Sequence, residues 1–152
     1  MKRTNRLVVE LGLLIVATFM AACSSEPVSP EDEQAAAFAD LRTAVTGTVA
    51  DEARQREVLA IVDSLENDVD ELRTILVRRR EELRALNADY DATREDFVEF
   101  TRQMEARIQA GRRRALERRQ TLVAALTADE WDALGKAETR TMKSVSRSMQ
   151  GI

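Results

Sequence analysis

Apolar residues recur at seven-residue spacing through the middle of the chain. Two interleaved series share this spacing: one is apolar at every position, and the other is interrupted by two polar residues. The first comprises Val62, Val69, Leu76, Leu83, Tyr90, Phe97 and Met104, and the second Val58, Leu65, Leu72, Arg79, Leu86, Thr93 and Phe100. Alternating steps of three and four residues are typical of a coiled-coil seam. The pattern therefore predicts that long amphipathic helices form the body of the protein.

The series crosses one segment that favours a turn. Asn87, Asp89 and Thr93 are residue types that compete with the helical backbone and are common at turns and caps. Thr93 and Asp96 also have the spacing of a capping box, which marks the start of a helix. We therefore expect the chain to fold back at residues 87–89. The alternative is one continuous helix that buries its apolar stripe against a second chain in a dimeric coiled coil.

Charge favours the hairpin. Residues 24–72 contain 13 acidic and 3 basic side chains, whereas residues 73–119 contain 9 acidic and 13 basic ones. A fold at residues 87–89 lays the acidic stretch 51–71 beside the basic stretch 102–119. Opposite charges along a helix seam select the orientation of the two helices. The pattern predicts an antiparallel coiled-coil hairpin.

A shorter helix is expected on the N-terminal side of the hairpin, over about residues 33–46. Phe38, Leu41 and Val45 share one face of it, and Gly47 is a suitable residue for its end. After Pro30 the chain contains no proline, and it is rich in alanine, leucine, arginine and glutamate. The fold class predicted for the chain is therefore all-α.

A final helix is predicted over residues 128–149, packed as a further element against the hairpin. Thr127 is a suitable N-cap, and Glu130 three residues later completes a capping box. Leu126 and Trp131 flank the cap and form the matching hydrophobic staple. The complete prediction is an antiparallel coiled-coil hairpin with short N-terminal and C-terminal helices.

The first 22 residues have the layout of an export signal. Lys2, Arg3 and Arg6 precede twelve uncharged residues, 11–22. A basic start, an apolar core and small residues at the end are typical of a secretory signal peptide. Twelve residues span about 18 Å as a helix, well short of the ~30 Å hydrocarbon core of a bilayer. We therefore predict that residues 1–22 are a cleaved signal rather than a membrane-spanning helix.

The only cysteine of the chain, Cys23, directly follows this segment and is preceded by Ala21 and Ala22. This arrangement resembles the bacterial lipoprotein signal, although Met20 stands where that family more often carries leucine, valine or isoleucine. The resemblance implies cleavage between Ala22 and Cys23 and acylation of Cys23. Ser24 after the cysteine implies an outer-membrane anchor facing the periplasm. The alternative is an ordinary signal peptide that leaves a free thiol.

Two prolines set the expected domain boundaries. Both Pro27 and Pro30 lie within residues 23–33, which are predicted to form the lipidated cysteine and a flexible tether. Residues 34–152 are predicted to form the α-helical domain.

The stretch "LTADE", residues 126–130, resembles the LTxxQ motif of the periplasmic Spy/CpxP-like chaperones and stress regulators. Glu130 stands where that family carries glutamine, and the chain has one copy where the family usually has two. The resemblance implies a bent helical hairpin that holds unfolded proteins or reports envelope stress. A capping box alone also accounts for these residues.

Composition narrows the functional classes. Histidine is absent, and the one thiol is expected to be acylated, so the commonest general base and the softest metal ligands are missing. We expect no enzymatic activity, no metal and no cofactor beyond the lipid on Cys23. The net charge of −4 and the export signal argue against a nucleic-acid partner. The expected partner is an envelope protein or a second copy of the chain.

Runs of arginine are the remaining feature with a chemical interpretation. Consecutive helical residues point about 100° apart, so Arg112, Arg113 and Arg114 spread around their helix instead of forming one patch. Solvated faces and pairing between helices explain such runs. The alternative is contact with an anionic partner such as lipopolysaccharide, peptidoglycan or an acidic protein. Arg79 is a candidate for a specific role because it occupies a seam position, where a lone polar residue often determines register.

Overall fold

The computed structural model describes residues 28–150. These residues form four α-helices and no strand, which confirms the all-α class. The helices are α2 (Pro30–Thr48), α3 (Glu52–Ala88), α4 (Arg94–Ala124) and α5 (Ala128–Gln150). Cys23 and Ala22 lie outside the described residues.

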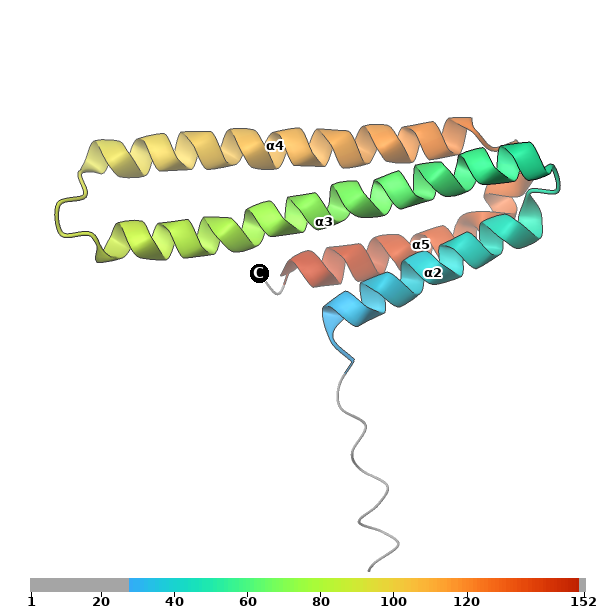
Figure 1. The fold of residues 1–152 in the computed structure, drawn as a ribbon, viewed down its shortest axis with the longest axis horizontal. Coiled ribbons are helices and arrows are strands. Elements are labelled where there is room, and N and C mark those ends of the chain that lie inside the picture. The colour runs from blue at the N-terminus through green and yellow to red at the C-terminus, as the bar shows by residue number, and fades with distance from the viewer. Residues whose placement is uncertain (1–27, 151–152) are drawn as a thin grey trace, which may run out of the picture.

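The two long helices form the predicted antiparallel hairpin, with α3 and α4 side by side along their length (Figure 1). The capping box at the start of α4 is complete: the Thr93 amide donates to Asp96 Oδ2 at 2.8 Å, and the Asp96 amide donates to Thr93 Oγ1 at 3.3 Å. Tyr90 lies in the turn and is fully exposed. The alternative of one continuous helix is therefore wrong, because the chain reverses where its side chains favour caps.

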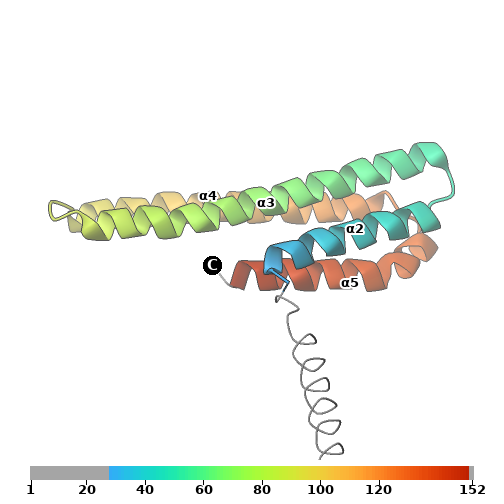
Figure 2. The ribbon, with the colours of Figure 1, turned by 60° about the horizontal axis from the view of Figure 1, so that its bottom comes forward.

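The two shorter helices form a second antiparallel pair. Both views show α2 and α5 side by side below one half of the hairpin (Figures 1 and 2). Helix α5 contacts α3 of the hairpin, as expected, but its main partner is α2. Small polar side chains on α5 allow this close approach. Thr141 Oγ1 donates to the Ala37 carbonyl at 3.0 Å, and Ser148 Oγ donates to Gln34 Oε1 at 2.6 Å.

Helix α2 begins earlier than expected. It starts at Pro30, inside the segment 23–33 that was predicted to be a tether. Ser29 caps it, accepting a hydrogen bond of 3.0 Å from the Asp32 amide. Proline suits the first turn of a helix because its fixed φ is already helical and its missing N–H has no partner there. At the other end, α2 continues through Gly47 to Thr48.

The main core lies where the two pairs of helices overlap. Its fully buried side chains come from α2, α3, α4 and α5 and include Phe38, Leu41, Val45, Val58, Val62, Leu65, Leu122 and Leu134. A smaller cluster of Leu72, Met104 and Ile108 continues along the hairpin. Val69 is the last residue of α3 that belongs to the main core. The far end of the hairpin is therefore stabilised by contacts between α3 and α4.

Ion pairs join the helices as the charge pattern predicts. Arg114 Nη2 lies 2.9 Å from Glu71 Oε2, and Arg118 Nε lies 3.2 Å from Asp68 Oδ2, so basic α4 contacts acidic α3. Arg42 of α2 also contacts Asp63 of α3, at 2.8 Å. Because these pairs are partly exposed, each contributes about 0–1 kcal/mol, and their main effect is on orientation.

Candidate functional site: the arm and its groove

The hairpin is longer than the helix pair beneath it. The ends of α3 and α4 project past Pro30 of α2 and Gln150 of α5 (Figures 1 and 2). We call this projection, residues 77–88 and 94–103, the arm. Its α3 portion spans about 18 Å at 1.5 Å per residue. The arm therefore has two helices, whereas the rest of the described chain has four.

Apolar side chains on the arm remain uncovered. Val98 is 61% exposed and Val77 is 40% exposed. Phe97, Phe100 and Leu83 are only half-buried, although they occupy the predicted seam. In a four-helix bundle a neighbouring helix would bury these residues. The arm thus presents apolar surface that the described helices do not cover.

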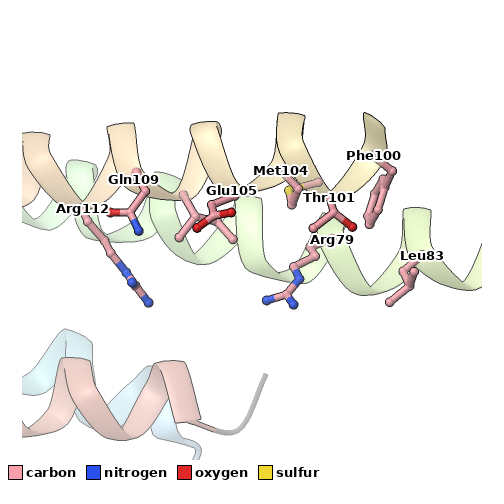
Figure 3. Close-up of a pocket in the computed structure, with 9 residues that line it drawn as sticks. Arg79, Leu83, Phe100, Thr101, Met104, Glu105, Gln109 and Arg112 are labelled. Atoms are coloured by element: carbon pink, nitrogen blue, oxygen red, sulfur yellow. The ribbon is translucent and has the colours of Figure 1, made fainter. Parts of the chain in front are cut away.

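A pocket of about 280 Å³ lies at the base of the arm (Figure 3). Its apolar floor comes from both helices, and two arginines lie at its edge. The lining residues are Arg79 and Leu83 of α3 with Phe100, Thr101, Met104, Glu105, Ile108, Gln109 and Arg112 of α4. The guanidinium groups of Arg79 and Arg112 both point to the side on which α2 begins and α5 ends (Figure 3).

Two further depressions extend this pocket. One, lined by Leu76, Arg79, Arg80, Leu83 and Met149, reaches the end of α5. The other, lined by Arg94, Phe97, Val98, Thr101, Arg102 and Glu105, reaches the tip of the arm. Because each shares two residues with the pocket, the three depressions are neighbours along the hairpin, and we call them together the groove.

The groove is cationic. Arg79, Arg94 and Arg112 form no ion pair with any described residue, whereas Glu105 is the one acidic residue among those that line the three depressions. Arg102 lies 2.7 Å from Glu99 and is neutralised locally. An apolar floor with unneutralised arginines favours a ligand that is apolar on one side and anionic on the other.

The structure separates the four candidate arginines. Arg79 and Arg112, 33 positions apart in the sequence, line the same pocket. Arg114 instead pairs with Glu71 and lies 3.8 Å from Asp68, so it holds the hairpin together. Arg113 is exposed on α4 and lines none of the described depressions. Only two of the four arginines therefore belong to the candidate site.

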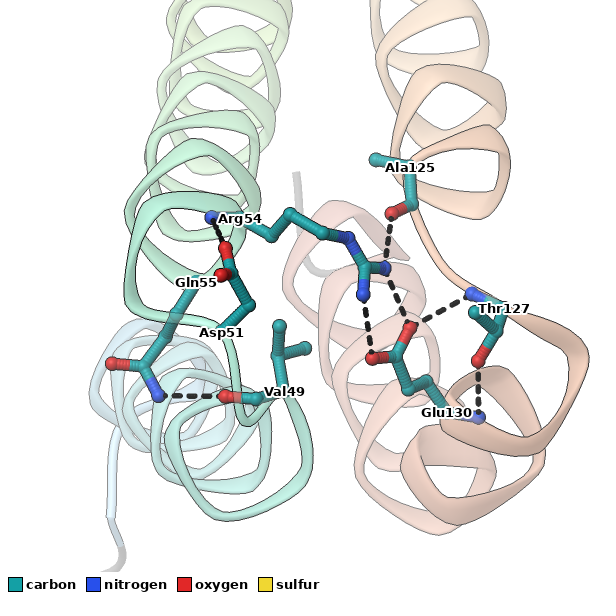
Figure 4. A network of polar contacts seen from close by, with 7 residues as sticks. All are labelled: Val49, Asp51, Arg54, Gln55, Ala125, Thr127 and Glu130. Atoms are coloured by element: carbon teal, nitrogen blue, oxygen red, sulfur yellow. Dashed lines mark hydrogen bonds and ion pairs between the residues drawn. The ribbon is translucent and has the colours of Figure 1, made fainter.

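The capping motif lies at the opposite end of the molecule, where α4 turns into α5 (Figure 4). The Thr127 amide donates to Glu130 Oε2 at 2.8 Å, and the Glu130 amide donates to Thr127 Oγ1 at 3.3 Å. Arg54 of α3 adds a bidentate contact to the Glu130 carboxylate, at 3.1 and 2.8 Å. Its Nη2 also donates to the Ala125 carbonyl at 3.2 Å. The motif thus fastens the start of α5 to the start of α3.

The apolar residues of the motif have packing roles. Leu126 is half-buried against the main core. The Arg119 guanidinium lies 5.7 Å from the centre of the Trp131 ring, within the range of a cation–π contact. Arg119 also pairs with buried Glu138 at 2.7 Å. All four residues of the LTxxQ-like motif therefore contribute to the turn between α4 and α5.

The Glu130 contacts predict how stability depends on pH. Hydrogen bonds from Arg54 and from the Thr127 amide lower the Glu130 pKa to about 2. A carboxyl with a lowered pKa stabilises the fold above its unfolded pKa, near 4.3, and this contribution is lost as the pH falls toward 2. The free energy of unfolding should therefore decrease more steeply between pH 4.5 and 2 in the wild type than in Glu130→Gln. Urea titrations at several pH values, with Glu95→Gln as an exposed control, measure this difference; equal slopes for all three proteins contradict it.

None of the described helices combines the length and apolar character needed to cross a bilayer. Within residues 28–150, no three acidic, histidine or cysteine side chains converge as metal ligands. No model of a known protein family, no curated protein and no solved structure matches the chain. The lipoprotein signal and the LTxxQ-like motif therefore remain predictions from the sequence.

Sequence reasoning missed part of the groove and one partner of the capping motif. Thr101, Glu105 and Gln109 line the pocket, but their spacing of four residues resembles any solvated helix face. Arg54 lies 76 positions from Glu130, and no local pattern relates the two residues. Pairs this distant come together only through the packing of the helices.

Proposed function

We propose that the chain is a membrane-anchored lipoprotein of the bacterial outer membrane, whose periplasmic helical domain is a non-enzymatic interaction module. The apolar surface of the arm, which no described helix covers, is the observation that carries the interaction role. Apolar surface that stays exposed beside charged side chains is typical of sites that bind other proteins. The absence of histidine and the acylation expected at Cys23 support a binding role over a catalytic one.

The proposed anchor makes one prediction. Replacing Cys23 by serine removes the acylation site and, with it, about 0.8 kcal/mol of membrane affinity for each buried methylene. Cys23→Ser should therefore move from the membrane fraction to the soluble fraction, as measured by fractionation and immunoblotting. Ser24→Ala, one residue away, should stay with the membranes. A Cys23→Ser protein that still sediments with membranes would contradict the proposed anchor.

The interaction role is tested by placing a photoreactive amino acid on the arm in living cells. Val98 and Leu116 provide a matched pair, because both are apolar residues of α4 and are 61% and 60% exposed. Val98 lies on the arm, whereas Leu116 lies on the part of α4 outside the arm and the groove. A discrete crosslinked product at Val98 but not at Leu116 supports the proposal. Equal products at both positions, or none at either, contradict it.

A Spy/CpxP-like chaperone or envelope-stress regulator is a second candidate function. The observation that favours it is the same exposed apolar surface, because a chaperone keeps such surface accessible to unfolded proteins. Residues 24–152, which contain every described core residue, should then suppress the aggregation of a denatured model protein at near-stoichiometric amounts. Light scattering measures the effect, and Val98→Asp should weaken it. No suppression would leave the specific interaction module as the proposed function.

A further inference from the structure

The groove lies along the hairpin, next to the point at which the shorter pair of helices, α2 and α5, stops covering it. One of its depressions is lined by Met149, in the last turn of α5, and by Leu76 and Leu83 of α3. Beyond Met149 the apolar stripe of the hairpin continues, but its covering helix has ended. An added helix in the groove would therefore cover the arm as α2 and α5 cover the rest of the hairpin. Docking of an amphipathic helix into an apolar groove is a common mode of recognition.

The charges along the groove indicate the charge of the ligand that would fit it. Arg94 and Arg112 are separated by 18 positions on α4, or about 27 Å along the helix axis. Both line the groove and lack an ion pair among the described residues, as does Arg79 on the facing helix. Glu105 alone opposes them within the groove. A partner with acidic residues distributed along its length fits these positions.

This distribution disfavours two other occupants. A lipid carries its charge at one end of an apolar tail, whereas these arginines are spread along the groove. The arm of a second copy presents the same arginines, so pairing two grooves face to face would place like charges together. A helix with an apolar face and acidic flanks would contact both the apolar floor of the groove and the arginines at its edge.

We propose that the groove binds an acidic amphipathic helix of a partner protein, with its apolar residues against Leu83, Phe100 and Met104 and its carboxylates on Arg79, Arg94 and Arg112. This inference rests on the proposed interaction role and specifies the chemistry of the partner. The pocket between Arg79 and Arg112 receives the main apolar side chain of the helix. Such an anchor supplies most of the affinity in helix-in-groove complexes.

The test uses a designed probe, because the partner is to be defined by its chemistry. The probe is a fluorescein-labelled 16-residue helical peptide with leucines at helical spacing on one face and glutamates on its flanks. A second peptide has lysine in place of every glutamate, and a third has glutamine in place of every leucine. Fluorescence anisotropy measures binding to residues 24–152 at low and at high salt.

The expected result is saturable binding of the acidic leucine peptide and at least tenfold weaker binding of the other two. The double variant Arg79→Ala/Arg112→Ala should raise its Kd about five- to tenfold, because it removes two exposed charge pairs. Arg113→Ala, next to Arg112 but outside the groove, should leave Kd unchanged. High salt should weaken the binding because it screens exposed charges.

Three results would overturn the inference: no binding of the acidic peptide, equal binding of the lysine peptide, or equal effects of Arg79→Ala/Arg112→Ala and Arg113→Ala. Circular dichroism verifies that each variant is folded, as expected for exposed arginines without ion pairs. Vesicles containing an anionic lipid are tested as competitors of the peptide. If the vesicles displace the peptide from the wild type but not from Arg79→Ala/Arg112→Ala, a lipid surface is the better ligand of the groove. The proposal of a helical partner is then rejected. A position-specific crosslink at Val98 alongside a failed peptide test would reject this inference while leaving the interaction role standing.

Discussion

Replacing Phe38 by alanine is expected to lower the free energy of unfolding by about 3–5 kcal/mol, the range for removing a buried aromatic side chain. Phe38 is fully buried and belongs to the core that joins α2 to the hairpin. The loss combines apolar surface returned to water with a cavity that surrounding helices fill only in part. Urea unfolding of residues 24–152, followed by circular dichroism, measures the change.

Val98→Ala serves as the control for this experiment. Val98 is 61% exposed on the arm, so its truncation should change the free energy of unfolding by less than about 0.5 kcal/mol. The contrast tests where the core lies as well as how large it is. Comparable losses in the two variants would mean that the arm is buried and that the main core is elsewhere.

Replacing Gly111 by leucine should separate the two long helices at the base of the arm. A Cβ atom added at Gly111 would lie 3.1 Å from Leu72 Cδ1 and 3.5 Å from Leu72 Cβ, and leucine adds three further carbon atoms. Overpacking of this kind typically costs about 1–3 kcal/mol. We expect a loss of that size in urea unfolding, together with reduced binding of the acidic peptide, because Ile108 and Arg112 flank this position.

Gly47→Leu is the matched control for Gly111→Leu. Gly47 is exposed near the end of α2, and a Cβ atom there meets no other atom within 4 Å. The same substitution should therefore be neutral or stabilising, because leucine has the higher helix propensity by up to about 1 kcal/mol. A Gly111→Leu protein as stable as Gly47→Leu would show that the helices are not in close contact at Gly111.

Local patterns account for the success of the helix predictions. The heptad spacing predicts α3 and α4, and the cap at Thr93 predicts the turn between them, because each depends on residues a few positions apart. The start of α2 was misplaced because Pro30 was interpreted as a tether residue, whereas proline also starts helices. Both outcomes follow from the short range of the interactions involved.

Local sequence patterns could not predict that α5 packs against α2. This packing depends on hydrogen bonds between positions more than 100 residues apart, such as Thr141 with Ala37 and Ser148 with Gln34. These side chains are small and polar, so hydrophobic periodicity underestimates the face that they bury. The sequence showed an additional helix but not the surface on which it packs.

The amino-acid sequence alone specified the helices, their caps, the turn of the hairpin and the charge match between α3 and α4. Each of these follows from side-chain spacing along one segment or from the sum of charges over two. The tertiary structure decided that the pair of α2 and α5 is shorter than the hairpin, that Arg79 and Arg112 share one pocket, and that Arg114 does not join them. The groove exists only because helices of different length pack together. Residues distant in the sequence therefore determine which part of the surface is covered and which is exposed.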